Sequence, residues 1–98
     1  MSINEIEKIR DKFDVVLGVY DYYYYNTDLE NNKVFYLYKG KIKKLKSEVI
    51  VISLDKRDKI KIEIRRYIAR DLYIRFKTNY EELLKYLEEV VNQKEVVV

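Results

Sequence analysis

Residues 48–77 decide the fold, and they read EVIVISLDKRDKIKIEIRRYIARDLYIRFK. Apolar and polar residues alternate here in three short runs, which we predict to be strands at 48–54, 59–66 and 71–77. The breaks between these runs are only a few residues long. Short connections favour antiparallel neighbours, because parallel pairing needs a crossover of a dozen residues or more. The simplest topology is therefore a meander.

The rest of the chain extends this sheet and adds helices at its two ends. Further strands are predicted at 14–25, 33–38 and 41–46, and helices at about 3–13 and 79–93. Each helix starts with a capping-box pattern, and the second carries a stripe of leucine and valine at helical spacing. We therefore predict one α+β domain, residues 1–98, with an antiparallel meander sheet of five to six strands and both helices packed on one face.

An alternative is a small, partly closed β-barrel capped by the C-terminal helix. The order of helix, many strands and helix resembles, in order alone, the strand-rich body and closing helix of pleckstrin-homology-like barrels. That resemblance would imply a curled sheet with the last helix across one end.

Composition limits the class of protein. The 98 residues include no Cys, His, Pro or Trp, so disulfides and thiolate metal sites are excluded. The longest apolar runs, 15–20 and 49–54, are far shorter than the roughly 20 residues of a membrane-spanning helix. We expect a cytoplasmic protein, in the host cytoplasm if its source is a virus. Abundant Lys and Glu fit a hyperthermophile, archaeal or archaeal-viral, although an AT-rich genome gives the same bias.

Charge divides unevenly along the chain. Residues 33–77 hold fifteen Lys and Arg against five Asp and Glu, a net charge of +10. Residues 1–32 have a net charge of −4 and residues 78–98 a net charge of −3, which leaves +3 for the whole chain. A basic middle between acidic ends points to an anionic partner for the strand-rich part.

Alternation sorts the predicted strands into two faces. The core face is expected to hold Val15, Leu17, Val19, Phe35, Leu37, Ile50, Ile52, Leu54, Ile60, Ile62, Ile64, Leu72, Ile74 and Phe76. Lys44 breaks the alternation, so a bulge is expected between Ile42 and Leu45. Two helices about 10 Å across cannot cover both faces of the sheet, so the second face must meet water, a partner or a second copy.

That second face is predicted to be aromatic and cationic. Rings on which bases stack, beside a cationic groove for phosphates, are typical of proteins that bind single strands with little sequence preference. The predicted nucleic-acid-binding residues are Tyr20, Tyr22, Tyr24, Tyr36, Tyr38, Lys41, Lys43, Lys59, Lys61, Arg65 and Arg75. The structural alternative is that cross-strand tyrosines stabilise the sheet and lysines cover their rings.

Catalysis is not expected. Without His and Cys, the commonest general base, metal ligand and thiol nucleophile are missing, and we expect no metal and no cofactor. Asp55 followed by Glu63-Ile64-Arg65 resembles the metal-binding Asp and Glu-x-Lys of restriction-type nucleases, with arginine in place of lysine. We favour the alternative, in which Asp55 belongs to a turn and Glu63 pairs with Lys61 or Arg65.

Two functions follow for the aromatic and cationic face. The first is non-catalytic nucleic-acid binding, for which the lysines argue because they are normally depleted in protein interfaces. The second is a small viral or mobile-element protein-interaction module, an inhibitor or adaptor of a host complex, which tyrosine enrichment fits equally well. A homodimer is compatible with either function, and the tail Val96-Val97-Val98 could add an edge strand within or between copies.

Overall fold

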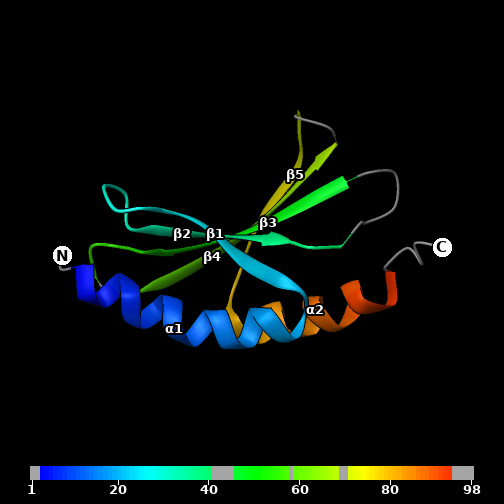
Figure 1. Ribbon diagram of the computed structural model, residues 1–98. Helices are drawn as coiled ribbons and strands as arrows, with labels where there is room; N and C mark the ends of the chain where they lie inside the picture. Colours follow the sequence, from blue (N-terminus) through cyan, green and yellow to red (C-terminus); the bar gives the residue numbers. More distant parts are fainter. Residues whose placement is uncertain (1–2, 41–45, 58, 69–70, 94–98) are drawn as a thin grey trace.

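Five antiparallel strands form one sheet, and two helices lie on one of its faces (Figure 1). The computed structural model describes residues 3–40, 46–57, 59–68 and 71–93. In chain order the elements are α1 (Ile3–Val19), β1 (Tyr22–Asp28), β2 (Lys33–Tyr38), β3 (Lys46–Leu54), β4 (Ile60–Ile68), β5 (Asp71–Thr78) and α2 (Tyr80–Gln93). The strand order in the sheet is β1-β2-β3-β4-β5. The predicted α+β meander is confirmed, and the sheet is not closed into the alternative barrel.

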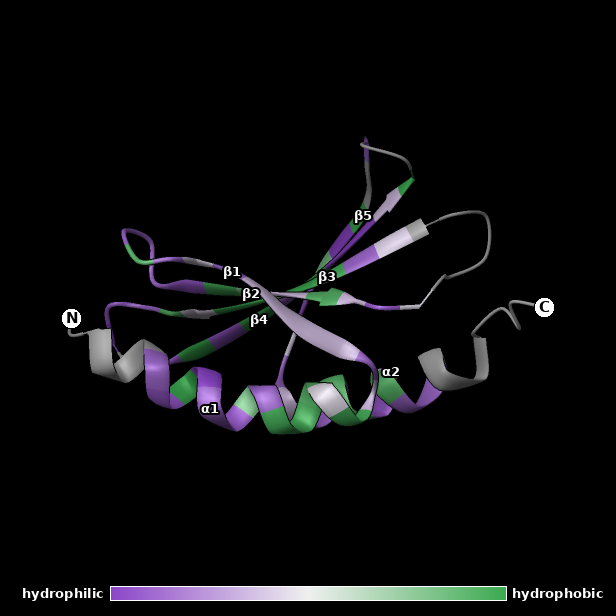
Figure 2. Ribbon diagram, viewed as in Figure 1, coloured by the Kyte–Doolittle hydropathy of each residue, from purple (hydrophilic) through white to green (hydrophobic). Residues whose placement is uncertain are grey.

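The two helices run in the same direction beneath the sheet. The ring of Phe13 on α1 meets the ring of Tyr80, the first residue of α2, edge to face at 5.9 Å. One to two turns later, the Tyr20 hydroxyl just after α1 donates to Glu88 of α2. Figure 2 shows hydrophobic residues in the central strands and interspersed with hydrophilic residues along both helices. The core between the two layers holds the inward side chains of both.

α1 is longer than predicted, because it continues through residues 14–19 that were expected to begin a strand. Ile9, Phe13 and Leu17 follow at a spacing of four and are all buried, so they form one helical stripe against the sheet. The valines of this stretch favour strands intrinsically, but docking of the stripe outweighs that preference. Val15 and Val19, predicted in the core, are 72% and 74% exposed on the helix's outer side.

β1 ends at Asp28, three residues after the predicted end at 25, and the other boundaries agree with the prediction to within two residues, except where residues are not described. The predicted strand 41–46 and the bulge between Ile42 and Leu45 fall almost entirely outside the described residues, as does the tail 96–98. Among the described strands, register shifts occur at Tyr24/Asn26 and at Arg66/Tyr67. Residue 79 caps α2, since the Asn79 side chain accepts a hydrogen bond from the Glu82 amide at 2.9 Å.

The core includes fewer residues of the outer strands than predicted. Ile50, Ile52, Leu54, Ile62 and Ile64 are buried as expected, under α1 and α2. Three predicted core residues are partly exposed near the ends or outer edge of the sheet: Ile60, Ile74 and Phe76. The ring of Phe76 still meets Tyr86 of α2 edge to face at 5.6 Å. In the part of the chain described, no helix is long and apolar enough to cross a membrane.

Candidate functional site

We call the sheet face that points away from the helices the open sheet face. Cross-strand pairing places its side chains in three rows that run from β1 toward β5. The rows are Tyr23, Leu37, Val49, Arg65 and Arg75; then Asn26, Phe35, Val51, Glu63 and Lys77; then Asp28, Lys33, Ser53 and Lys61. Within the described ranges, neither helix lies over these rows (Figure 1).

Three tyrosines predicted for this face are in the core instead. Tyr22, Tyr36 and Tyr38 are each less than 5% exposed and lie beneath the helices. Pairing decides this, because Tyr36 lies opposite Ile50, whose side chain points into the core. Successive side chains of a strand point to opposite faces, so burial of Tyr36 turns its neighbours to the other side. Phe35 and Leu37, which were predicted in the core, therefore lie on the open sheet face.

The other two predicted tyrosines also lie on the helix side. Tyr20 is half-buried and its hydroxyl bonds to α2, as described above. Tyr24 lies under the guanidinium of Arg10, whose central carbon is 3.7 Å from the ring centroid. The predicted placement on the open sheet face is therefore wrong for all five tyrosines. Among the side chains that are described, the aromatic residues of the paired strands on that face are Tyr23, Phe35 and Tyr67.

The cations divide differently. Lys61, Arg65 and Arg75 lie on the open sheet face, as alternation along β4 and β5 predicted. Lys59 is exposed in the β3–β4 turn, where its amide donates to the Asp55 side chain at 2.9 Å. The remaining two predicted lysines, Lys41 and Lys43, lie outside the described residues.

The centre of the open sheet face is apolar and its β4–β5 side is basic. Phe35, Leu37 and Val49 are only partly exposed and Val51 is buried, although neither helix lies over this face in the described ranges. Arg65 joins the two regions, because its guanidinium pairs with Glu63 and lies 6.0 Å from the centroid of the Phe35 ring. The result is an aromatic and aliphatic surface bordered by positive charge.

A shallow hollow of about 350 Å³ lies at one end of this face and is lined by residues of β2, β3, β4 and β5. Three ammonium groups line it, those of Lys33, Lys61 and Lys77, together with the carboxylates of Asp55 and Glu63. Asp55 accepts amide hydrogen bonds within its turn, which lower the pKa of its carboxyl below the ordinary range. Glu63 is already paired with Arg65, and the Lys61 ammonium lies 3.9 Å from the Asp55 carboxylate, so Lys33 and Lys77 are the lysines most available to an anion.

The carboxylates that resembled a nuclease motif have structural roles. Asp55 closes the β3–β4 turn through the amides of Arg57 and Lys59, at 2.8 and 2.9 Å. Glu63 is bonded to Arg65 on the same strand. Among the described residues, no three acidic side chains come together in a group that could hold a metal ion.

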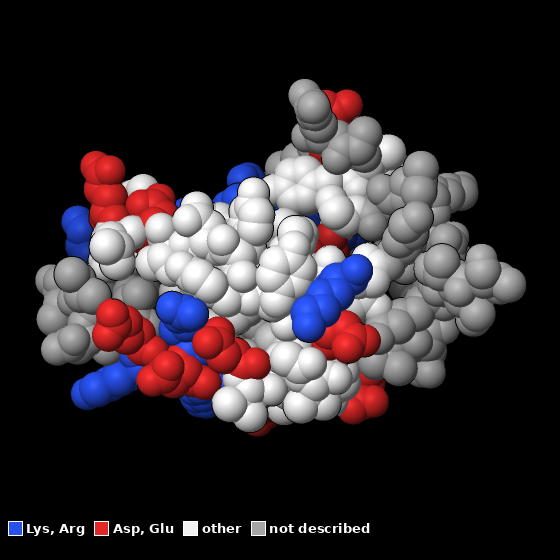
Figure 3. Space-filling view, viewed as in Figure 1, with Lys and Arg blue, Asp and Glu red and all other residues white. Residues whose placement is uncertain are grey.

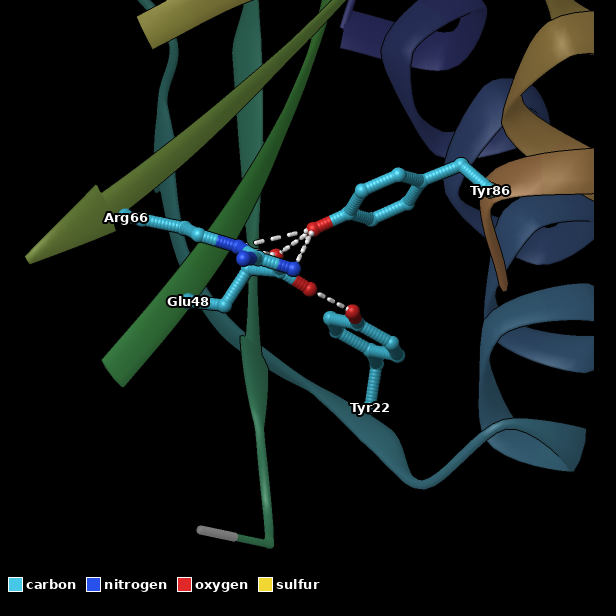
Figure 4. Close-up of polar contacts among 4 residues, drawn as sticks. All are labelled: Tyr22, Glu48, Arg66 and Tyr86. Atoms are coloured by element: carbon cyan, nitrogen blue, oxygen red, sulfur yellow. Dashed lines mark hydrogen bonds and ion pairs between the residues drawn. The ribbon is translucent and has the colours of Figure 1, made fainter. Parts of the chain in front are cut away.

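A buried polar cluster joins β1, β3, β4 and α2, and the sequence analysis missed it (Figure 4). The Glu48 carboxylate is fully buried and pairs with the Arg66 Nε at 2.8 Å. The hydroxyls of Tyr22 and Tyr86 both donate to this carboxylate, and the Arg66 guanidinium also donates to the Tyr86 oxygen. Burial, followed by the negative charge of Glu48, raises the pKa of both tyrosines far above their ordinary range.

This cluster stabilises the fold and does not present a reactive group. The carboxylate has no exposure to solvent, and its charge is compensated by Arg66 and two hydroxyl donors. The signal for it was present in the sequence, because the alternation that points Ile50 and Ile64 inward also points Glu48 and Arg66 inward. Two opposite charges on the core side of neighbouring strands predict a buried ion pair.

A second polar contact holds α1 to the sheet. The hydroxyl of Tyr36 donates to Asp14 at 2.6 Å, and Asp14 pairs with Arg10 one turn earlier at 3.5 Å. Burial and this hydrogen bond raise the pKa of Tyr36. Tyr36 can be buried in the core because Asp14 of α1 accepts the hydrogen bond of its hydroxyl.

A separate groove of about 600 Å³ separates β5 from α2. Its walls carry Phe76 and Tyr86, and its rim has two lysines, Lys77 and Lys85, and two glutamates. Positive and negative charges balance, so the groove shows no preference for an anion.

No family model, curated protein or solved structure matches the chain.

Proposed function

We propose that the protein binds single-stranded nucleic acid on the open sheet face, without catalysis and with little preference for sequence. The observation that carries this proposal is the charge on that face. Its rows hold five basic residues, Lys33, Lys61, Arg65, Arg75 and Lys77, against the two carboxylates of Asp28 and Glu63. The Glu63–Arg65 pair removes one charge of each sign, so four basic residues remain against one carboxylate and the net charge of the rows is +3.

The aromatic residues of the face supply the second part of the proposal. Tyr23 is 41% exposed at the β1 side, and Phe35 lies one row further along the neighbouring strand. Bases of a single strand are free to stack on such rings, each stack contributing about 1–3 kcal/mol. Duplex bases are already stacked, so we expect weaker binding of duplex than of single strands.

The test is a titration of a fluorescent single-stranded oligonucleotide, and of its duplex, between about 50 and 300 mM salt. The variant Lys61→Ala/Lys77→Ala removes two exposed cations from the open sheet face. Its matched control, Lys8→Ala/Lys85→Ala, removes two exposed cations from the helix layer and gives the same net charge. Loss of two phosphate contacts lowers the slope of log K against log salt by about 1.4, whereas the control keeps the slope.

A second pair of variants tests stacking. Tyr23→Ala removes a ring from the open sheet face, and we expect about 5- to 150-fold weaker binding. Tyr24→Ala removes the neighbouring ring on the helix side, and we expect affinity to stay unchanged. Absence of single-strand binding at low salt, or equal effects of Lys61→Ala/Lys77→Ala and the helix-layer control, would reject the proposal.

One observation favours a second function, a protein-interaction module on the same face. The centre of the open sheet face is apolar, with Phe35, Leu37 and Val49 partly exposed on β2 and β3 beside the buried Val51. Apolar centres with charged rims are typical of protein interfaces. In that case the lysine variants would change association with a protein partner and its salt dependence, with no nucleic acid bound.

A further inference from the structure

β1 lies at one edge of the sheet, and no strand of the described chain pairs with its outer side. The unpaired N–H and C=O groups of an edge strand are a template for another strand. We propose that β1 pairs antiparallel with β1 of a second copy of this chain, which forms a two-fold dimer with one continuous sheet. This inference goes beyond nucleic-acid binding and does not depend on it.

The two edges of the sheet differ in the features that prevent edge pairing. At the other edge, β5 carries Asp71, Arg75 and Lys77, and the two basic residues are exposed. Pairing of β5 with its own copy would gather four basic side chains against two carboxylates along one seam, and this excess of like charge opposes the pairing. Residues 22–27 of β1, YYYYNT, carry no charge at all. Self-pairing is therefore unopposed by charge only at the β1 edge.

The side chains of β1 are also unusually apolar for an edge. Tyr25 is 60% exposed, and Tyr23 and Tyr24 are 41% and 36% exposed. Figure 3 shows a broad uncharged area across the middle of the side where β1 faces the reader, with charged side chains of α1 below it. An aromatic side chain pairs favourably with a β-branched one across two strands, so burying these rings against the second copy stabilises the pairing.

The register shift in β1 selects one alignment of the two copies. Tyr25 is the extra residue of the bulge, so Tyr24 and Thr27 point to the helix side while Tyr23 and Asp28 point to the open side. A two-fold axis between Tyr25 and Asn26 sets the two bulges against each other. It then places Tyr24 opposite Thr27 and Tyr23 opposite Asp28 of the second copy. In this alignment, opposing side chains outside the bulge share a face, as antiparallel pairing requires.

This axis is perpendicular to the sheet, so the two open sheet faces lie on the same side of the dimer. The pair of strands is only seven residues long. Such an interface is smaller than the about 800 Å² per partner of a typical stable complex, so we expect a concentration-dependent dimer with micromolar affinity.

The experiment is sedimentation equilibrium of the full chain without nucleic acid, from about 1 µM to about 1 mM. We expect the mass to rise from 12.0 kDa toward twice that value as concentration increases. Tyr25→Lys introduces a charge at an exposed edge position and should keep the protein monomeric. Ile74→Lys is the matched control, because it places the same charge at a 40% exposed position of β5 and should leave the dimer intact.

Mixing two variants of opposite charge at residue 25 distinguishes a lost interface from a folding defect. The two copies of residue 25 flank the proposed axis, so Tyr25→Lys and Tyr25→Glu should each be monomeric alone and should form a heterodimer when mixed. Far-UV circular dichroism checks that each variant folds. The inference is overturned if the wild-type chain stays monomeric throughout, if Ile74→Lys abolishes the dimer while Tyr25→Lys does not, or if the mixture fails to associate.

Discussion

Replacement of Arg66 by leucine tests the role of the buried polar cluster. The substitution removes the only positive charge that the described structure places beside the Glu48 carboxylate, which is fully buried. Two hydrogen-bond donors remain, the hydroxyls of Tyr22 and Tyr86. A neutral donor does not compensate a full charge, and breaking a buried ion pair by removing one partner typically costs about 3–5 kcal/mol.

That cost is large for a domain of this size. Domains have unfolding free energies of about 5–15 kcal/mol in total. Near 100 residues, each 1 kcal/mol lowers Tm by about 4–8 °C, so the Arg66→Leu variant is expected to lose about 12–40 °C. Because α2 is tied to β4 through Tyr86, we expect this helix to loosen before the rest of the domain.

The matched control is the double variant Glu48→Met/Arg66→Leu. It removes both charges, so no carboxylate is left uncompensated. It loses the acceptor for two tyrosine hydroxyls and the Arg66 hydrogen bonds to the Tyr86 oxygen, at about 1 kcal/mol for each lost partner. We therefore expect the double variant to be more stable than Arg66→Leu alone. Equilibrium unfolding in guanidinium, followed by circular dichroism, measures both. If the double variant is as unstable as Arg66→Leu, or if Arg66→Leu costs under about 1 kcal/mol, the ion pair does not stabilise the fold as argued.

Three further outcomes are expected. The three buried tyrosines with raised pKa stay protonated in the fold, so stability is complete below about pH 10 and falls above it by about 1.4 kcal/mol per pH unit for each, measured by unfolding at pH 8 and 11. These tyrosines are Tyr22, Tyr36 and Tyr86. Gly18→Ala should stabilise the fold by about 0.5 kcal/mol, because a Cβ there meets nothing within 4 Å. Gly40→Ala should destabilise the fold by about 1–3 kcal/mol, because its Cβ would lie 2.9 Å from the Tyr38 ring. The Tm values of the two variants should therefore move in opposite directions. Asn79→Ala removes the cap of α2 and should cost about 1 kcal/mol in denaturant unfolding, with Asn79→Asp as the control that keeps it.

Local patterns in the sequence were sufficient for the meander and for α2. The short breaks around Asp55 and Ile68 leave room only for antiparallel turns, and alternation along β4 places Lys61 and Arg65 away from the core without reference to any other element. The same alternation places Glu48 and Arg66 on the core side of neighbouring strands, so the buried ion pair also has a local signature. These features depend on short connections between neighbouring strands, or on the two-residue alternation of side chains that every strand has.

The face of β2 and the length of α1 depended on contacts between residues distant in the chain. Both faces of β2 are apolar, so hydropathy favoured Phe35 over Tyr36 for the core, and only pairing with β3 reversed that choice. Burial of Tyr36 also needed Asp14, 22 residues away, to accept its hydroxyl hydrogen bond. The valines after Phe13 favour a strand locally, and docking of the helix against the sheet outweighed that preference. The sequence by itself determined which strands alternate and where most of the chain turns. Tertiary structure decided which side of each strand became the core, because that choice depends on the pairing of strands and on partners that the local sequence does not contain.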